Sequence, residues 1–247
     1  MAKNIIFGTH PVKEAIEAGR QIDKIMIKKG ADSELLRQIR EVARRHKIHV
    51  QEVPVEKLNR MDRNANHQGI IAVVSAIEYR EISEVVQELT EAEENPLIVV
   101  FDGVTDVRNF GAIARSAECA GAHALVVPIK NSAPVNAEAI KSSAGALSII
   151  PVCRVGSTRN TLRYLQECGM QIVASTEKSN TLLFESDLKG PTVIVMGSED
   201  TGISKEVLKM CDVKLAIPLV GTIESLNVSA AAAVMLFEVV RQRKMEM

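Results

Sequence analysis

The chain of 247 residues has no tryptophan, and aromatic residues make up only 3% of it. Proteins that bind single-stranded RNA on an RRM-type stacking platform need exposed aromatic rings, so this class is disfavoured. The four cysteines, Cys119, Cys153, Cys168 and Cys211, lie far apart and form no CxxC pair. We therefore expect free thiols, no disulfide framework and no metal site.

Long apolar runs and a large net charge are also missing. No stretch reaches the ~18 apolar residues of a membrane span, and no signal-peptide core is present, so we expect a cytoplasmic protein. The formal net charge is −1, but residues 1–77 contain 14 Lys and Arg against 9 Asp and Glu, whereas residues 78–95 contain 1 against 7. The basic first part indicates an anionic partner.

The hydrophobic pattern predicts two α/β domains joined by a linker. In residues 1–77, helix patterns cover 10–19 and 33–47, and strand patterns cover 22–29, 49–53 and 69–77. Residues 78–95 are expected to form an acidic linker with one short amphipathic helix. Residues 96–247 alternate helices with strand patterns at 97–103, 124–129, 171–175, 192–197 and 213–219. This alternation predicts a parallel sheet covered by helices on both faces.

Two features of residues 1–77 are candidate RNA contacts. A basic stripe recurs at three- or four-residue steps along the second predicted helix, at Arg37, Arg40, Arg44 and Lys47. Such a stripe can follow a phosphate backbone or can be a solvated helix face. His67 and Gln68 lie in the polar turn NHQG before a strand, which either contacts RNA or is an ordinary turn.

Two strands of the second domain end in loops that combine glycine with polar side chains. The segment DVRNFGAIARSAECAG places Asn109 at a predicted helix start and Arg115 six residues later, with a planar guanidinium suited to phosphate. The strand TVIVMG continues into SEDTGIS. Gly197 there permits close approach of a ligand, and Glu199 is a carboxylate at the end of a strand, where α/β proteins bind ligands.

A third loop follows the apolar run 215–219, which is expected to be a strand covered on both faces. Ser225 or Asn227 is the predicted cap of the alanine-rich helix that comes next, and the surplus of polar side chains indicates a ligand crevice. An ordinary polar turn is the alternative. The chain has no GxGxxG and no Walker lysine motif, so dinucleotide binding is disfavoured.

Together the three loops resemble the motifs of the SpoU subclass of the SPOUT RNA methyltransferases. The matching segments are N-x-G-x-x-x-R at 109–115, GSE at 197–199 and IPLxGxxxSLNVSxAAAVxLFE at 217–238, in the family's order and spacing. FGTHPVKEAIEAG and NHQGIIA are similar to the family's ribosomal L30e-like substrate-binding domain, so the resemblance covers essentially the whole chain. One departure is Asp200-Thr201, where relatives commonly have smaller or basic residues.

The resemblance implies an S-adenosylmethionine-dependent enzyme that methylates a ribose 2′-hydroxyl of RNA. It implies an L30e-like domain over residues 1–77, a linker over 78–95, and a trefoil-knotted α/β domain over 96–247 that forms a homodimer. The layout is most similar to bacterial enzymes that methylate a guanosine in 23S rRNA, on naked RNA or a ribosomal precursor. A tRNA 2′-O-methyltransferase and a non-catalytic RNA-binding or ribosome-assembly protein are the alternatives.

The resemblance also assigns roles to residues. Arg115 is expected to stabilise the developing alkoxide. Asn109 is expected to orient Arg115 or the ribose, and Glu199 is expected to anchor Arg115 or the substrate. Ser225 and Asn227 are expected to position the target nucleotide and the cofactor loop. The cofactor is expected to contact backbone groups of Gly197, Ile217 and Leu226. The expected contacts to RNA are Arg37, Arg40, Arg44, His67 and Gln68. No metal is required.

Overall fold

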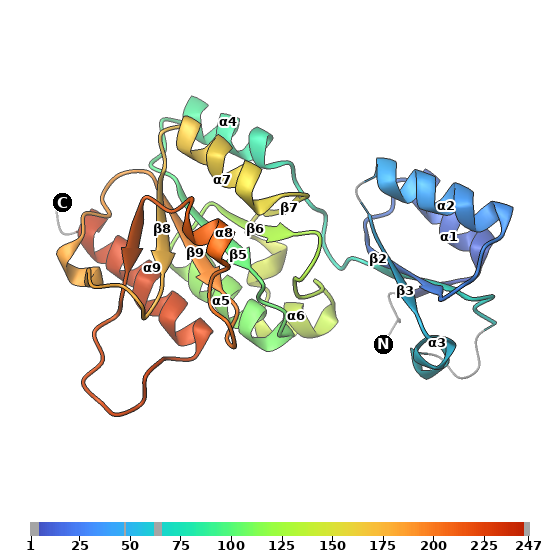
Figure 1. Ribbon diagram of the computed structural model, residues 1–247. Helices are drawn as coiled ribbons and strands as arrows, with labels where there is room; N and C mark the ends of the chain where they lie inside the picture. The colour runs from blue at the N-terminus through green and yellow to red at the C-terminus, as the bar shows by residue number, and fades with distance from the viewer. Residues whose placement is uncertain (1–4, 47, 62–65, 245–247) are drawn as a thin grey trace. The chain divides into compact units, whose positions relative to one another are not determined.

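The computed structural model describes residues 5–46, 48–61 and 66–244. Its contacts divide the chain into two units (Figure 1). Unit 1 runs to Glu78 and includes Pro134–Asn136; unit 2 contains Tyr79–Ala133 and the chain from Ala137 onward. Lys47, a member of the predicted basic stripe, lies outside the described residues.

Unit 1 is a mixed sheet with helices on both faces (Figure 1). The strands are β1 (Ile5–Phe7), β2 (Ile22–Lys28), β3 (His49–Val53) and β4 (Ile70–Val74), in the order β1-β4-β2-β3. The helices are α1 (Thr9–Glu17), α2 (Glu34–Arg45) and α3 (Val55–Met61). Strand β2 pairs in parallel with β3 and antiparallel with β4, which in turn pairs antiparallel with β1. The predicted helices and strands of this unit are present, while β1 and α3, only three and seven residues long, were not predicted.

Strand alternation creates two hydrophobic clusters in unit 1. Ile25 and Ile27 of β2 face α1 and α2 and pack with Ile39 and Ala43. Met26 lies between them on the chain, and it faces the other way and packs with Leu58 of α3. Helices α1 and α2 thus cover one face of the sheet, and α3 covers part of the other.

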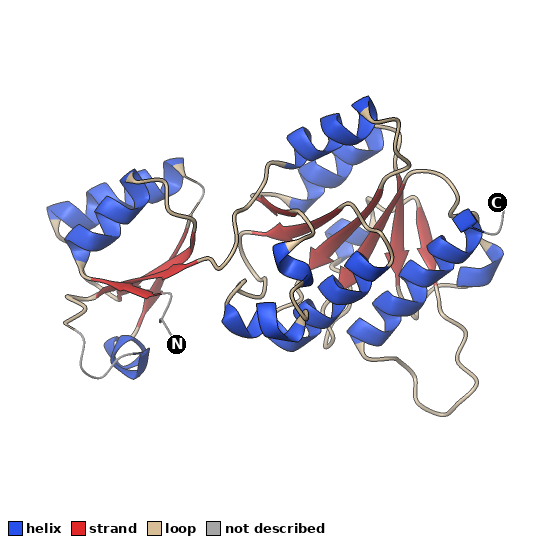
Figure 2. Cartoon of the chain, turned by 180° about the vertical axis from the view of Figure 1, so that it is seen from behind, coloured by secondary structure: helices blue, strands red, loops and turns tan. Residues whose placement is uncertain are grey.

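Unit 2 is an α/β domain with a parallel six-stranded sheet, as the alternation of elements predicted. Its strands are β5 (Leu97–Asp102), β6 (Ala124–Pro128), β7 (Val152–Val155), β8 (Gln171–Ser175), β9 (Thr192–Gly197) and β10 (Val213–Leu215), in the order β10-β8-β9-β5-β6-β7. Its helices are α4 (Ile82–Glu91), α5 (Val107–Cys119), α6 (Ala137–Ser142), α7 (Thr158–Glu167), α8 (Lys205–Leu208) and α9 (Val228–Lys244), with short 3-10 turns at η1 (Ala146–Ser148) and η2 (Leu183–Glu185). Helices cover both faces of this sheet, with α4 and α7 on one side and α5 and α9 on the other (Figure 2).

The segment expected to be a linker packs onto unit 2. Its helix, α4, is the short amphipathic helix that the pattern indicated, and it buries Val85 and Val86 against Ile98, Val126 and Leu165. The contacts therefore place the start of unit 2 at Tyr79, and the acidic residues of α4 form the solvent face of a packed helix.

Two expectations for the strands of unit 2 were wrong. Strand β7 was not predicted, although it completes one edge of the sheet by parallel pairing with β6. The predicted strand 213–219 ends at Leu215 on the opposite edge, and Leu219 is 40% exposed rather than covered. Pro218 cannot donate a ladder hydrogen bond, which is consistent with the early end of this strand.

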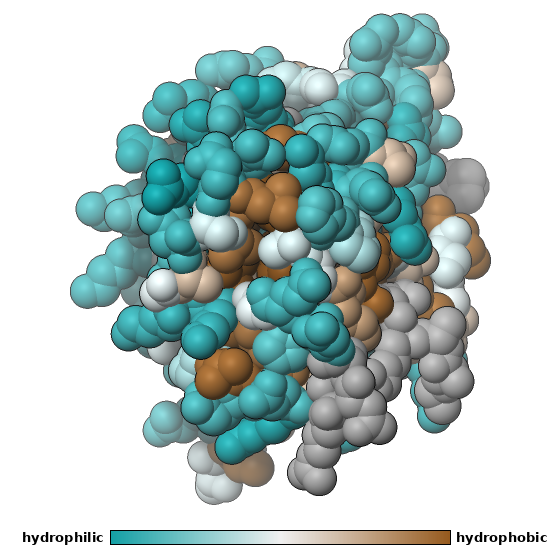
Figure 3. Space-filling model, turned by 90° about the vertical axis from the view of Figure 1, so that its right-hand side faces the viewer, coloured by the Kyte–Doolittle hydropathy of each residue, from teal (hydrophilic) through white to brown (hydrophobic). Residues whose placement is uncertain are grey.

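One face of the described chain is mostly polar. In the space-filling view, hydrophilic side chains cover most of the visible face, and apolar side chains appear between them in small groups (Figure 3). Among the described helices, none is both long enough and apolar enough to cross a membrane.

Candidate active site

A pocket of about 410 Å³ lies at the carboxyl ends of β8 and β9. Three segments line it: residues 175–178 after β8, residues 196–202 around the end of β9, and residues of the loop that leads into α9. Gly197, Ile217 and Leu226, the three positions expected to contact a cofactor, all line this pocket, as does Ser225. This is the ligand crevice that parallel α/β sheets form beyond the ends of their strands.

Gly197 is required by the path of the chain itself. A Cβ atom added there would lie 2.3 Å from the backbone carbon of Gly202 and 2.3 Å from the nitrogen of Ile203. The loop after β9 folds back through reciprocal backbone hydrogen bonds between Ser198 and Gly202, and Gly202 has a φ of +68°. The space beside Gly197 that the sequence argument gave to a ligand is thus taken by residues 202–203.

The three polar loops meet in one hydrogen-bond network. The Nδ2 atom of Asn109 donates to Oε2 of Glu199 at 2.8 Å. The Nδ2 atom of Asn227 donates to Oε1 of Glu199 at 2.9 Å and to Oδ1 of Asn109 at 3.1 Å. Side chains separated by up to 118 residues therefore hold one carboxylate at the edge of the pocket.

Asn227, one of the two predicted caps, also starts α9. Its Oδ1 atom accepts hydrogen bonds from the backbone N–H of Ser229 at 2.9 Å and from the Ser229 hydroxyl at 2.6 Å. Because the amide oxygen caps the helix, the amide nitrogen points to Glu199. Capping and site geometry are thus set by a single side chain.

Asn109 is not the cap of α5, contrary to the expectation. Asp106 is the cap, because its Oδ1 atom accepts from the backbone N–H groups of Arg108 at 2.9 Å and Asn109 at 2.8 Å. This arrangement places Asn109 in the first turn of the helix, where its side chain is available for Glu199.

Arg115 lies outside the pocket of its own chain. It is exposed on α5, six residues beyond Asn109, and forms no hydrogen bond or ion pair with the residues that the structure describes. Six helical residues correspond to about 9 Å of rise. Of the two expected partners of Glu199, Arg115 and the substrate, Arg115 does not contact it in this chain, where two amides occupy the carboxylate.

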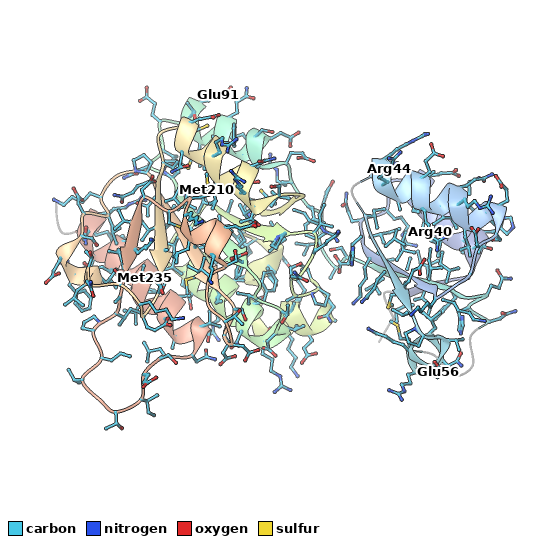
Figure 4. All side chains as sticks on the ribbon, in the orientation of Figure 1. Arg40, Arg44, Glu56, Glu91, Met210 and Met235 are labelled. Atoms are coloured by element: carbon cyan, nitrogen blue, oxygen red, sulfur yellow. The ribbon has the colours of Figure 1, made fainter. Side chains whose placement is uncertain are left out.

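The arginines of α2 are mostly paired with acids of their own unit. Arg37 makes two contacts of 2.9 Å with Asp32, and Arg40 contacts Glu52 at 2.8 Å. The hydrogen bonds between Arg37 and Asp32 raise the pKa of the arginine and lower the pKa of the aspartate. Arg44 is exposed, with no described partner. Arg40 and Arg44 both lie on α2, and the side-chain view labels them (Figure 4).

His67 and Gln68 belong to a hydrogen-bonded turn. The His67 ring contacts Oδ1 of Asn59 at 2.8 Å and accepts from the backbone N–H of Gly69 at 3.0 Å. Gln68 Oε1 accepts from the Thr9 hydroxyl at 3.2 Å. The turn and the start of α1 are therefore held together, and His67 has a structural role whatever else it contacts.

One wall of the pocket was not predicted. It is formed by Ser175, the last residue of β8, and by Thr176, Glu177 and Lys178, which follow it. The rule that ligands bind beyond the carboxyl ends of parallel strands applied to this strand as well. The absence of glycine in STEKSN made the segment look like an ordinary loop.

Comparison with known proteins identifies the family. Residues 96–237 match the model of the SpoU rRNA Methylase family, and residues 5–80 match the model for RNA 2′-O ribose methyltransferase substrate binding. The two matches together cover both units. The chain belongs to the SpoU family of RNA 2′-O-ribose methyltransferases and carries the substrate-binding domain of that family.

Individual relatives agree with this assignment over nearly the whole chain. A protein named as a TrmH family tRNA/rRNA methyltransferase from Staphylococcus haemolyticus is 35% identical over 97% of this chain and 96% of its own length. The 23S rRNA (guanosine-2′-O-)-methyltransferase RlmB of Vibrio parahaemolyticus is 36% identical over 98% of each protein. The crystal structure of the SpoU methyltransferase AviRb from Streptomyces viridochromogenes with AdoMet matches with a TM-score of 0.61 at 26% identity, covering 97% of this chain and 90% of that one.

Proposed function

We propose that this chain transfers a methyl group from S-adenosylmethionine to a ribose 2′-hydroxyl of RNA, with the cofactor held in the pocket beside Gly197. The observation that carries the proposal is the network of Asn109, Glu199 and Asn227, which joins three separate motifs at that pocket. A fold kept only for RNA binding would have no need to hold a carboxylate between two amides at a cofactor-sized pocket.

The pocket suits the cofactor in two ways. Within the described residues, the backbone groups of Ile217 and Leu226 have no protein hydrogen-bond partner, so they are available to an adenosyl group. Three carboxylates, Glu177, Glu199 and Asp200, line the pocket with one ammonium, that of Lys178, and this excess of negative charge favours a cation. When bound, S-adenosylmethionine supplies an electrophilic methyl group on a positively charged sulfur.

The protein residues then position the acceptor and stabilise charge. Asn109, Glu199, Ser225 and Asn227 orient the ribose near the cofactor, and such positioning supplies ~7–11 kcal/mol in favourable cases. Arg115 holds a neighbouring phosphate and stabilises the alkoxide as the 2′-hydroxyl loses its proton. A guanidinium is too weak a base to remove that proton itself, so the proton leaves to phosphate or solvent.

We include a homodimer in the proposal, in which Arg115 of one copy serves the site of the other. The loop beside the pocket exposes several apolar side chains, and Phe237 of α9 is 49% exposed as well. The exposed apolar residues of the loop are Leu219, Val220, Ile223 and Leu226. A monomer gains nothing from this exposure, whereas a second copy would bury it.

We propose a guanosine in 23S rRNA, or in a ribosomal precursor, as the substrate, and the cytoplasm as the location. The two-unit layout and the similarity to RlmB over 98% of both chains support rRNA. A tRNA substrate is the second candidate, because relatives of equal similarity carry a tRNA/rRNA name.

The trefoil knot is also part of the proposal. The chain leaving β10 is bonded to the loop after β8, with Ala216 N–H donating to Thr181 and Leu183 N–H donating to Ala216.

The test is to incubate the full chain with S-adenosylmethionine and separate rRNA and tRNA pools, and then to map 2′-O-methyl groups by nuclease digestion and mass spectrometry. We expect methylation of rRNA. Methylation confined to tRNA would overturn the substrate, and absence of S-adenosylmethionine binding in isothermal titration would favour the assembly-factor alternative.

The role of Arg115 is tested by Arg115→Lys, which keeps the positive charge but loses the planar guanidinium that can bind a phosphate through two N–H groups at once. We expect a loss of turnover with little change in cofactor affinity, because Arg115 is assigned to a phosphate of the RNA and not to the cofactor. Wild-type turnover in this variant would rule out the assigned role.

A further inference from the structure

Two sets of cations in unit 1 differ in their surroundings. On α2, Arg37 is paired with Asp32, Arg40 with Glu52, and Arg45 with Glu41. A phosphate approaching these arginines must compete with a carboxylate that each already contacts. The helix that looked most like an RNA-binding stripe in the sequence is therefore largely neutralised.

The second set lies on the opposite side of the sheet. Lys24 and Lys28 flank Met26 at two-residue steps on β2, so all three point to the face that α3 partly covers. Lys57 and Arg60 are three residues apart on α3 and exposed, while Leu58 packs inward. We call Lys24, Lys28, Lys57 and Arg60 the α3-face cations.

None of the α3-face cations forms an ion pair or a side-chain hydrogen bond with a residue that the structure describes. Glu56 is the acid within α3, and it is exposed (Figure 4). Glu52, on the neighbouring strand, projects to the other face and is bound to Arg40. Among the described residues, no acid is paired with these cations, whereas three arginines of α2 are each paired with one.

Lys24 shows how close these charges are. The side chain is half-buried, and its pKa is lowered first by burial and then by the positive charge of Lys57, with Asp23 acting in the opposite direction. Two ammonium groups that repel each other at a partly buried position would be stabilised by an anion between them. A phosphate of an RNA backbone is such an anion.

We propose that unit 1 docks the RNA backbone on the α3-face cations, and that the arginines of α2 contribute little. The proposal rests on the proposed function, since it specifies how the substrate-binding unit holds its RNA. Contacts of this kind are made to phosphates and carry no base information, so this face sets affinity while base selection lies elsewhere.

Two matched triple variants of the full chain test the proposal. One removes three exposed α3-face cations (Lys28→Gln, Lys57→Gln, Arg60→Gln), and the other removes three exposed cations of α2 (Arg37→Gln, Arg44→Gln, Arg45→Gln). Both lose the same charge from the same unit. The probe is a fluorescent RNA hairpin of mixed sequence, and the measurement is the dissociation constant at a series of salt concentrations.

We expect the α3-face variant to lower the slope of log affinity against log salt by about 2, since each lost phosphate contact removes ~0.7–0.9. Its affinity at moderate salt should fall about tenfold or more, while the α2 variant stays close to wild type. An equal or larger loss in the α2 variant would overturn the proposal, as would an unchanged slope in the α3-face variant.

Titration with S-adenosylmethionine separates the two proposals. Both variants should bind the cofactor as the wild type does, because the pocket lies in unit 2. If the wild type fails to bind the cofactor, the proposed function fails, and the salt slopes still decide which face of unit 1 holds RNA.

Discussion

At the scale of single residues, Asn227 combines two tasks that are usually separate. Its oxygen caps α9 and its nitrogen holds Glu199, so the amide has one orientation that serves both. A substitution that keeps the oxygen but removes the nitrogen separates these tasks.

We expect Asn227→Asp to keep a folded protein and to lose most methyl transfer. Aspartate is as good a cap as asparagine, but it places a second carboxylate against Glu199 in place of a donor. Hydrogen bonds to charged groups are worth ~1.5–3 kcal/mol, so turnover should fall about 10- to 150-fold. Initial rates of RNA methylation and thermal unfolding measure the two effects.

The matched control is Ser157→Ala, which removes a cap from α7 without touching the pocket. It should lower stability by ~1 kcal/mol and leave turnover nearly unchanged. Wild-type rates in Asn227→Asp would show that the contact with Glu199 is dispensable.

Residue types narrowed the cap of α9 to Ser225 or Asn227 but gave the wrong cap for α5, Asn109. Asp106 and Asn109 are both good caps three residues apart, and the sequence does not reveal where the loop after β5 ends. In the structure Asp106 is the cap of α5, because its side chain accepts hydrogen bonds from two backbone N–H groups. The acids and hydroxyls after β8 were missed for a different reason, because their role depends on the packing of distant strands.

At the scale of elements, the last turns of α9 hold the loop between β8 and β9. Gln242 donates to Ser186 O at 2.9 Å and accepts from Leu188 N–H at 2.8 Å, and it also donates to Glu238 at 2.8 Å. Glu238 is 5% exposed and accepts two hydrogen bonds from Arg241. The beginning of α9 borders the pocket, while its end fixes the loop that leads back to β9.

Glu238→Gln should lower the free energy of unfolding by ~1 kcal/mol near pH 7. The hydrogen bond from Arg241 is the main cause that lowers the pKa of Glu238 from its ordinary value of 4.5. Because the folded-state pKa is the lower one, this stabilisation is present above the ordinary value and is lost as the pH falls through the folded-state pKa.

Urea unfolding at neutral pH and again well below pH 4.5 measures this dependence. The difference between wild type and Glu238→Gln should shrink at the acid end, while Glu167→Gln, an exposed acid of α7, should differ little at either pH. A difference that is constant with pH would contradict the assigned ionisation.

Elements with strong periodicity were predictable, and short or edge elements were not. α2 and the central strands of unit 2 agree with their patterns within a few residues, because burial on one or both faces dictates their composition. Strand β7 has four residues and α3 has seven, too few to show a period. The helix of the acidic segment was predicted, but its packing was not, since the pattern shows an apolar stripe without its partner.

At the scale of the whole molecule, the division into two units separates the cofactor pocket from the α3-face cations. The hydrophobic cluster of unit 2 that runs from Val85 to Val207 includes no residue of unit 1. Val135, by contrast, belongs to unit 1 and accepts a hydrogen bond from Ala76.

A chain limited to residues 79–247 should fold and bind S-adenosylmethionine within about threefold of the full chain, because every residue that lines the pocket belongs to unit 2. Its KM for RNA should rise about tenfold or more with the loss of phosphate contacts. Titration calorimetry and methylation kinetics measure the two quantities. Loss of cofactor binding in a folded fragment would show that the units are not separable in function.

The shared carboxylate of Glu199 has an evolutionary consequence. Because Asn109 and Asn227 contact both Glu199 and each other, no one of the three can change without leaving the other two mismatched. Across a lineage these positions should be retained together, and a descendant that abandons methyl transfer should lose all three within a short interval. The network therefore acts as a single inherited character, although its parts are encoded in three distant places along the gene.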